Sequence, residues 1–273
     1  MTQTIASRLK TIALIGGGKM GEAIVSGLIN GALFSPDSII IAETVEDRRR
    51  YLESTYGVSC VADGAEIKHP STCLFAVKPQ VFRDVASHLS AVSSFDPERI
   101  ISIVAGITTK TIREFFKESA VIRVMPNTPL MVGAGMSAIA VSEDTAACEG
   151  ELVCELFSLM GKAIVIDESL INAATAINGS GPAYFARFVL ELAGAGEKAG
   201  LDQADSLLLA AQTMAGTARL LELGDVSPEE LIAAVTSPGG TTQAALQSFD
   251  VNGLSQVIDA AVLSAIKRAE ELA

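Results

Sequence analysis

The sequence predicts an α/β fold in which an N-terminal doubly wound sheet is followed by an all-helical C-terminal domain. Short apolar runs alternate with helix-like segments through the first part of the chain, which is typical of a parallel sheet with crossover helices. A glycine-rich turn joins the first of these runs to the first helix. From Glu168 onward the pattern is almost wholly helical. The predicted domains therefore span residues 1–167 and 168–273.

The composition is that of a globular protein with a large core. Of the 273 residues, 49% are hydrophobic and 19% are charged, which argues against disorder. Twenty basic and 32 acidic residues give a formal net charge of −12, so we expect neither nucleic acid nor a membrane surface as partner. No apolar run is long enough to predict a membrane span. The four cysteines lack zinc-like spacing, so we expect reduced, mostly buried thiols, no metal and a cytoplasmic protein.

The glycine-rich turn lies within residues 11–24, TIALIGGGKMGEAI. It matches G-x-G-x-x-G directly after the strand-like run Ile12–Ile15. We expect Gly16 to permit the tight turn, Gly18 to let a pyrophosphate approach, and Gly21 to let the helix pack closely on the strand. The helix would then present free N–H groups and a positive dipole end to phosphates. The context favours a Rossmann-like dinucleotide site over a turn that serves packing alone.

Further strand-like runs follow, and those up to residue 125 alternate with helices, which predicts a parallel sheet. They lie at Ile39–Ala42, Val58–Ala62, Leu74–Val77, Ile100–Val104, Val121–Met125, Ser137–Val141 and Ala163–Ile166. Residues 1–10 are interpreted as a tail before the first strand. Because ligands bind beyond the carboxyl ends of such strands, Lys78 and Ala105 are expected on the cofactor side. Pro126 and Pro129 fix a rigid turn at the same edge.

The residues after the second predicted strand carry conflicting signals about the cofactor. Glu43 follows Gly21 by about 20 residues, where an acidic side chain can accept a hydrogen bond from the ribose 2′-hydroxyl. Arg48, Arg49 and Arg50 could instead meet a 2′-phosphate, although a charge run usually marks a solvated face. The sequence leaves NADPH and NADH both open, and Glu43 favours NADH.

The C-terminal part predicts five helices rich in alanine and glycine. They run from Pro182 to about Gly200, then over Gln203–Leu223, Pro228–Val235, Thr242–Ser248 and Leu254–Leu272. Small residues let helices approach closely. These helices carry more apolar surface than a domain of this size can cover alone. We therefore expect a second copy of the chain to cover it, as in an obligate homodimer.

A second glycine-rich stretch, TSPGGTTQAAL, spans residues 236–246. Pro238 stiffens this loop, and Thr241 or Thr242 is expected to cap the following helix. A carboxylate would be held there by backbone N–H groups and threonine hydroxyls at the positive end of the helix. The alternative is an ordinary connecting turn, which needs fewer small or cyclic residues than this loop contains.

These motifs together resemble the pyrroline-5-carboxylate reductase family over nearly the whole chain. The resemblance is carried by IGGGKMGEAI, FAVKP at 75–79, IVAGIT at 103–108, RVMPNTP at 123–129, NGSGPAYF at 178–185 and SPGGTT at 237–242. The first motif is generic, whereas the last two in this order are close to diagnostic. The resemblance implies reduction of 1-pyrroline-5-carboxylate to L-proline with NADPH or NADH. It also implies a homodimer that can join into larger rings.

The resemblance and the two glycine-rich stretches together assign site residues. The expected cofactor contacts are Gly16, Gly17, Gly18, Lys19, Met20, Glu43, Thr44, Asp63, Val77, Lys78, Pro79 and Ala105. The expected substrate contacts are Glu168, Ser237, Gly239, Gly240, Thr241 and Thr242, and the Thr242 hydroxyl is the expected catalytic contact near the ring nitrogen. Asp63, Glu43 and Ala234 depart from the residues common in relatives. The first two of these bear on NADPH preference.

The expected chemistry needs a hydride donor and orientation of a cyclic imine that carries its own proton, so it requires no histidine dyad. His69 and His88 are accordingly expected to be surface residues. One alternative is a hydroxyacid dehydrogenase, which would want a lysine on the long central helix after a glycine pair. Lys198 is the sole lysine there and lies near the helix end. The other alternative is a dinucleotide-sensing module, which would have no need of the SPGGTT loop.

Overall fold

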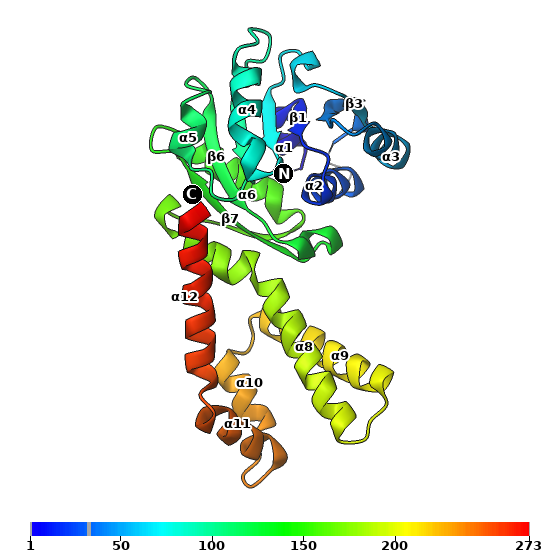
Figure 1. Ribbon diagram of the computed structural model, residues 1–273, viewed down its shortest axis with the longest axis vertical. Coiled ribbons are helices and arrows are strands. Elements are labelled where there is room, and N and C mark those ends of the chain that lie inside the picture. Colours follow the sequence, from blue (N-terminus) through cyan, green and yellow to red (C-terminus); the bar gives the residue numbers. More distant parts are fainter. Residues whose placement is uncertain (1, 32–33, 273) are drawn as a thin grey trace. The chain divides into compact units, whose positions relative to one another are not determined.

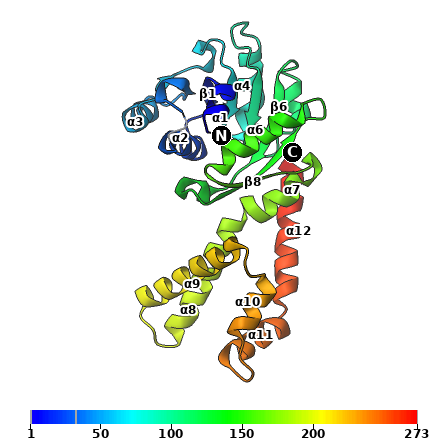
Figure 2. The ribbon, with the colours of Figure 1, turned by 180° about the vertical axis from the view of Figure 1, so that it is seen from behind.

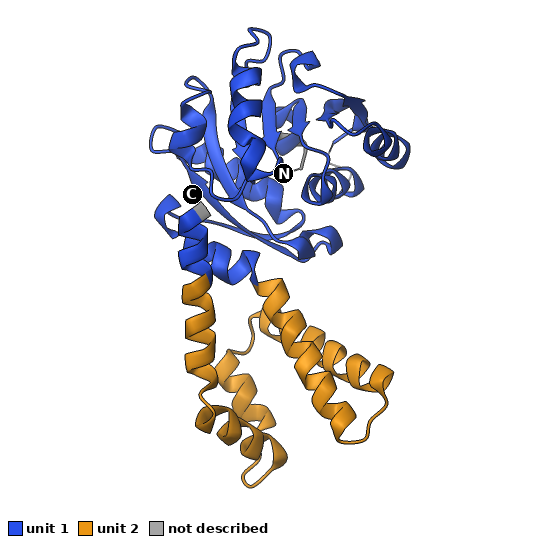
Figure 3. Ribbon diagram, viewed as in Figure 1, with its two compact units in different colours: residues 1–180, 265–273 blue, residues 181–264 orange. Residues whose placement is uncertain are grey.

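The structure is a computed structural model that describes residues 2–31 and 34–272. The described residues form two compact units, coloured separately in Figure 3. One unit draws on residues 1–180 and 265–273, and the other consists of residues 181–264. Residues 168–180, which the sequence analysis places in the second domain, belong to the first unit.

The first unit is built on a sheet with the strand order β3-β2-β1-β4-β5-β6-β7-β8 (Figure 1). The strands are β1 (Ile12–Ile15), β2 (Ile39–Ala42), β3 (Ser59–Val61), β4 (Thr72–Phe75), β5 (Arg99–Ser102), β6 (Ala120–Met125), β7 (Gly135–Val141) and β8 (Gly161–Val165). The sequence predicted each of them with ends that differ by no more than two residues. The reversal of strand order at β1 and β4 gives the doubly wound arrangement that the sequence analysis predicted.

The last two strands, β7 and β8, run opposite to the other six, because β7 pairs antiparallel with β6. The chain between them, residues 126–134, holds only the short turn η3 (Thr128–Val132). A parallel crossover needs about a dozen residues or more, so this connection is too short to return the chain to the starting edge. The direction of β8 follows from β7, to which β8 is parallel.

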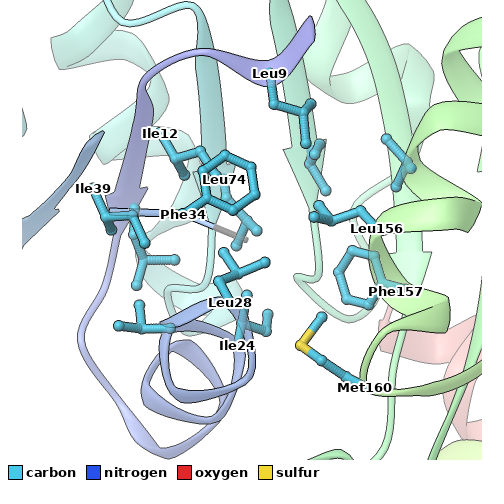
Figure 4. Packing of buried hydrophobic residues seen from close by; sticks show 14 of the residues in the cluster. Leu9, Ile12, Ile24, Leu28, Phe34, Ile39, Leu74, Leu156, Phe157 and Met160 are labelled. Atoms are coloured by element: carbon cyan, nitrogen blue, oxygen red, sulfur yellow. The ribbon is translucent and has the colours of Figure 1, made fainter. Parts of the chain in front are cut away.

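Helices cover both faces of the sheet. In the first unit these are α1 (Thr2–Leu9), α2 (Lys19–Asn30), α3 (Glu46–Tyr56), α4 (Pro79–Ser90), α5 (Thr109–Arg113), α6 (Ala147–Ser158) and α7 (Ile171–Ala174). Shorter turns are η1 (Pro36–Ser38), η2 (Gly64–Glu66), η4 (Glu168–Leu170) and the π-helical η5 (Thr175–Gly179). Alternate side chains of β1 join different cores: Ile12 and Leu14 join one, whereas Ala13 and Ile15 join the other. Figure 4 shows the first core, where α2 and α6 contribute side chains to the same face of the sheet.

The N-terminal residues form helix α1 and not the predicted tail. Ile5 and Leu9 stand four positions apart on one face of α1, and their side chains are 3% and 0% exposed. Both belong to the core that also contains α2 and α6. Among the described side chains of α1 these are the buried ones, and a pattern this short is too weak a period to be recognised in the sequence.

The second unit is helical, as predicted. It contains α8 (Gly181–Lys198), α9 (Gln203–Leu223), α10 (Pro228–Val235), α11 (Thr241–Val251) and most of α12 (Leu254–Leu272). Figure 2 shows α8 beside α9, and the two helices enclose an apolar groove of about 700 Å³ lined by residues such as Phe185, Leu207 and Met214. Few side chains of this unit are buried. Leu208 of α9, for example, is 66% exposed.

Three expectations from composition can be compared with the structure. All four cysteines are unpaired, but only Cys73 is fully buried, and Cys148 is exposed, so the expectation of mostly buried thiols was wrong. Among the described residues, no group of three or more histidine, cysteine or acidic side chains is arranged to hold a metal ion. None of the described helices combines the length and the apolar character that a membrane span requires.

Candidate dinucleotide and substrate sites

The glycine-rich loop after β1 requires glycine at Gly16 and Gly21 for close packing of the chain and has open space beside Gly18. Gly16 has φ of +106°, and a Cβ added there would lie 2.8 Å from the Ala76 carbonyl oxygen. A Cβ on Gly21 would lie 2.3 Å from the Gly16 oxygen, so the close packing expected of that glycine is confirmed. A Cβ on Gly18 would meet no atom of the described chain within 4 Å. Packing within the chain therefore does not require glycine at position 18. A phosphate that approaches the backbone there would require it, because a side chain would block the approach.

Helix α2 begins in this loop without a side-chain cap. Its N-cap is Gly18, and its first helical hydrogen bond runs from Glu22 N–H to the Gly18 oxygen at 2.9 Å. The N–H groups of the preceding turn therefore have no partner within the helix. Free N–H groups at a positive dipole end fit a phosphate. The open backbone at Gly18 and this uncapped helix start thus satisfy what a dinucleotide pyrophosphate requires.

The other expected cofactor residues follow the carboxyl ends of neighbouring strands. Glu43 and Thr44 come after β2, Asp63 after β3, Val77, Lys78 and Pro79 after β4, and Ala105 after β5. These strands are parallel neighbours in the sheet, so the structure brings the residues to one edge. Lys78 is the N-cap of α4 and Pro79 its first residue, where the missing N–H of proline costs no hydrogen bond.

Glu43 reaches back to the glycine-rich loop. One carboxylate oxygen accepts a hydrogen bond from Gly17 N–H at 3.0 Å, and the other accepts one from Val45 N–H at 2.9 Å. In Rossmann domains an acidic side chain at the carboxyl end of the second strand accepts a hydrogen bond from the ribose 2′-hydroxyl. Glu43 lies at that position, against the loop.

The three arginines of α3 are each engaged within the chain. Arg48 Nε donates to the Gly17 oxygen at 2.7 Å, and its guanidinium pairs with Glu22 at 2.5 Å. Arg49 donates to the backbone oxygens of Glu43 and Thr44 at 2.7 and 2.9 Å. Arg50 pairs with Glu46 one turn away on the same helix. Of the three arginines, only Arg50 has the solvent-exposed side chain that a solvated charge run would have.

Asp63 has partners that the sequence did not indicate. Its carboxylate accepts a hydrogen bond from Ala65 N–H at 2.9 Å and lies 2.9 Å from His88 Nε2. The bond from Ala65, followed by that from His88, lowers the pKa of the Asp63 carboxyl. His69 and His88 are both largely exposed, as expected. The separation of 25 residues between His88 and Asp63 left no sequence signal of this pair.

Glu168 lies in the first unit and binds two residues that sequence reasoning missed. Thr109 N–H donates to Glu168 Oε1 at 2.8 Å, and the Thr109 hydroxyl donates to Oε2. Arg123 Nη1 lies 3.4 Å from Oε1, and its side chain is 6% exposed. Burial lowers the pKa of Arg123, and the nearby Glu168 opposes that effect. An arginine inside the apolar strand VIRVM was the available signal, because a buried charge needs a partner.

The remaining expected substrate residues lie in the second unit, on the loop between α10 and α11. Neither Thr241 nor Thr242 caps α11, so that expectation was wrong: the N-cap is Gly240, and the two threonines are the first residues of the helix. Gly240 N–H donates to the Ser237 oxygen at 3.0 Å, which closes the turn before α11. Gly239 N–H donates to the Gln243 side chain at 2.7 Å.

This arrangement leaves the start of α11 open. Glycine has no side chain with which to cap the helix, so the first N–H groups of α11 have no partner within it. The Thr241 and Thr242 hydroxyls belong to the same turn. A carboxylate could therefore accept several hydrogen bonds at a positive helix end.

The first unit has a doubly wound sheet with a glycine-rich loop and an uncapped helix start at its carboxyl edge, and the helical unit has a loop that could bind an anion. These features are typical of the class of dinucleotide-dependent oxidoreductases. Comparison with known proteins narrows this class. The family model described as pyrroline-5-carboxylate reductase dimerisation matches residues 168–272, and that described as NADP oxidoreductase, coenzyme F420-dependent, matches residues 11–106. The chain belongs to the pyrroline-5-carboxylate reductase family, as its motifs indicated.

Relatives match this chain along almost its full length. The pyrroline-5-carboxylate reductase of Synechocystis is 39% identical and covers 96% of this chain and 97% of its own length. That of Pisum sativum is 34% identical with 98% coverage of both. The reductase structure from Coxiella burnetii has a TM-score of 0.90 at 31% identity and covers 97% of this chain and 99% of its own. The Plasmodium falciparum enzyme, solved with NADP bound, has a TM-score of 0.83 at 26% identity, covering 97% and 98%.

Gly18 and Gly16 give a matched pair of alanine substitutions. Gly18→Ala is expected to leave the thermal midpoint unchanged and to weaken dinucleotide binding about tenfold or more, roughly 1.4 kcal/mol, because its methyl group blocks an approaching phosphate. Gly16→Ala is expected to destabilise the fold by about 1–3 kcal/mol through backbone strain. Thermal denaturation and isothermal titration with NADH measure the two effects. Wild-type dinucleotide affinity in Gly18→Ala would argue against a pyrophosphate at this loop.

Proposed function

We propose that this chain reduces 1-pyrroline-5-carboxylate to L-proline with NADPH or NADH. The observation that carries the proposal is the open start of α11 within the SPGGTT loop, in a chain whose full-length relatives are named pyrroline-5-carboxylate reductases. The NADP in the Plasmodium falciparum structure supports use of a nicotinamide dinucleotide. The four unpaired cysteines support a cytoplasmic location, where thiols stay reduced.

The task of the protein in this reaction is orientation. The bound dinucleotide supplies the hydride. The N–H groups at the start of α2 hold the pyrophosphate, and those at the start of α11 hold the substrate carboxylate. The Thr242 hydroxyl hydrogen-bonds at the ring nitrogen, which carries its own proton, so no protein acid is needed. Fixing both reactants in one geometry lowers the entropic part of the barrier.

Glu168 has capacity for a substrate contact beyond its contacts within the chain. An ionised carboxylate offers about four acceptor positions. The Thr109 N–H, the Thr109 hydroxyl and Arg123 use three of them. The remaining position supports an additional hydrogen bond from substrate, with Thr109 and Arg123 fixing the carboxylate.

A steady-state assay tests the proposed function. Oxidation of NADPH or NADH is followed at 340 nm after addition of 1-pyrroline-5-carboxylate to the folded protein, and proline is measured as the product. We expect turnover with at least one dinucleotide. A protein that binds dinucleotide but gives no substrate-dependent oxidation would contradict the proposal and favour the sensing-module alternative.

Thr242→Val tests the proposed contact at the ring nitrogen. Valine keeps the shape of threonine but removes the hydroxyl. A lost hydrogen bond to a charged group is worth about 1.5–3 kcal/mol, so kcat/KM is expected to fall roughly tenfold to a hundredfold. Thr236→Val is the control, because the Thr236 hydroxyl donates to the Ile232 oxygen within α10. Equal kcat/KM for Thr242→Val and wild type would remove Thr242 from the reaction.

The proposal includes an obligate homodimer, with rings of dimers as a further assembly. Support comes from the match of residues 168–272 to a dimerisation family and from the apolar groove between α8 and α9. Leu190 and Leu207 line this groove and are exposed, and Leu208 of α9 is exposed as well. Surface of this kind, left uncovered in one helical unit, marks an interface between subunits.

Arginine at Leu208 or Met214 is expected to dissociate or unfold the dimer and to abolish activity, since a charge at an apolar interface must be desolvated without a partner. Val81→Arg is the control, an arginine on the exposed face of α4 in the first unit. Sedimentation velocity with the activity assay measures the effect. A folded, active monomer of the wild type at nanomolar concentration would contradict the obligate dimer, and faster-sedimenting species would report rings.

A further inference from the structure

A polar cluster between α2 and α3, beside the glycine-rich loop, has no part in the proposed reaction. Its centre is Glu22 in the first turn of α2, whose side chain is 14% exposed. The hydroxyls of Tyr51 and Tyr56 donate to Glu22 Oε1 at 3.0 and 2.9 Å, and Arg48 donates to Oε2 at 2.5 Å. Burial acts to raise the pKa of Glu22, but hydrogen bonds from Arg48, Tyr56 and Tyr51 outweigh it, and the pKa is lowered. The carboxylate is therefore charged at neutral pH.

Arg48 is held at three points. Its Nη2 pairs with Glu22, its Nε donates to the Gly17 oxygen at 2.7 Å, and its guanidinium carbon lies 5.0 Å from the centre of the Tyr51 ring. Gly17 N–H, in turn, donates to Glu43 at 3.0 Å. Arg48 and Glu43 thus bind the two polar groups of the same residue, in the loop where the cofactor is proposed to lie.

These two side chains have opposite preferences for a dinucleotide. At this position in Rossmann domains an acidic residue accepts a hydrogen bond from a ribose 2′-hydroxyl, and a nearby arginine accommodates a 2′-phosphate. The charge of Arg48 is already paired with Glu22. A phosphate bound at the remaining N–H groups of Arg48 would lie close to the Glu22 carboxylate, which already neutralises the guanidinium and would repel a second anion. Releasing Arg48 from Glu22 instead would leave a largely buried carboxylate without its cationic partner, which is unfavourable.

We infer that Glu22 is a cofactor-specificity residue, which withholds Arg48 from a 2′-phosphate and thereby favours the 2′-hydroxyl dinucleotide that Glu43 can bind. The inference rests on the proposed binding of a nicotinamide dinucleotide. It adds a second acidic determinant to Glu43: Glu43 lies in the loop after β2, and Glu22 lies in the first turn of α2.

Arg49 is the competing partner for a 2′-phosphate. Its Nη1 donates to the backbone oxygens of Glu43 and Thr44, and it forms no ion pair within the part of the chain that the structure describes. Arg50 is paired with Glu46, and both side chains are more than 60% exposed. A test therefore has to separate the contribution of Arg48 from that of Arg49, and the Arg50–Glu46 pair provides a matched control.

The test is isothermal titration of full-length protein with NADH and with NADPH, without 1-pyrroline-5-carboxylate. Wild type is expected to bind NADH at least threefold more tightly than NADPH. Glu22→Ala is expected to tighten NADPH binding fivefold or more and to leave the Kd for NADH within twofold. Adding Arg48→Leu to Glu22→Ala is expected to abolish that gain. Glu46→Ala, which removes the closer of the two acidic partners of Arg50 and leaves Asp47 at 4.0 Å, is expected to leave the ratio of the two Kd values unchanged.

Two results would overturn the inference: an unchanged ratio in Glu22→Ala, or a gain that survives Arg48→Leu, which would assign the phosphate to Arg49. If circular dichroism shows that Glu22→Ala is unfolded, Glu22→Gln replaces it, since glutamine keeps the shape and removes the charge. The same direction of change is expected there, and an unchanged ratio overturns the inference. Failure of wild type to bind either dinucleotide would overturn both the inference and the proposed function. The other outcomes described above bear on the inference alone and leave the proposed function intact.

Discussion

Backbone N–H groups left without an acceptor at two helix starts are the feature on which both proposed binding sites depend. Helix α2 begins at Gly18 and α11 at Gly240, and neither N-cap residue has a side chain that could satisfy the first turn. Two helices with no proposed ligand have such a cap, although α3 and α6 also begin without one. Asp202 caps α9 and Ser227 caps α10 with their own side chains. The uncapped starts are therefore available to a ligand, and a phosphate or a carboxylate is the group that fits them.

This use of backbone groups is consistent with the charge of the chain. A protein with a formal net charge of −12 repels anions at long range, yet both proposed ligands are anionic. Fixed N–H groups act over short distances and need no basic side chain. The two arginines of α3 that lie beside the glycine-rich loop are engaged within the chain, Arg48 by Glu22 and Arg49 by backbone oxygens. Recognition at this edge of the sheet is thus determined by local geometry more than by overall charge.

The sequence predicted the features that depend on local spacing. The glycines of the first loop, the eight strands and the C-terminal helices were each recognisable from short-range patterns. Two local predictions were wrong for identifiable reasons. The predicted N-terminal tail is helix α1, in which the buried residues among the described side chains are Ile5 and Leu9, and Gly240 rather than a threonine supplies the N-cap of α11. The antiparallel pairing of β7 with β6 was not predicted. The Glu22–Arg48 and Arg123–Glu168 pairs join residues 26 and 45 positions apart, and no periodicity reports such contacts.

Capture of a substrate carboxylate by the start of α11 is tested most directly by removing that carboxylate from the substrate. The measurement is kcat/KM for 1-pyrroline-5-carboxylate and for 1-pyrroline, with the same dinucleotide at saturation. Several charge-assisted hydrogen bonds are worth about 3 kcal/mol or more together, so we expect a ratio of about 100 or greater. Values of kcat/KM within about threefold of each other would contradict orientation through the carboxylate, since a factor of three corresponds to less than about 1 kcal/mol.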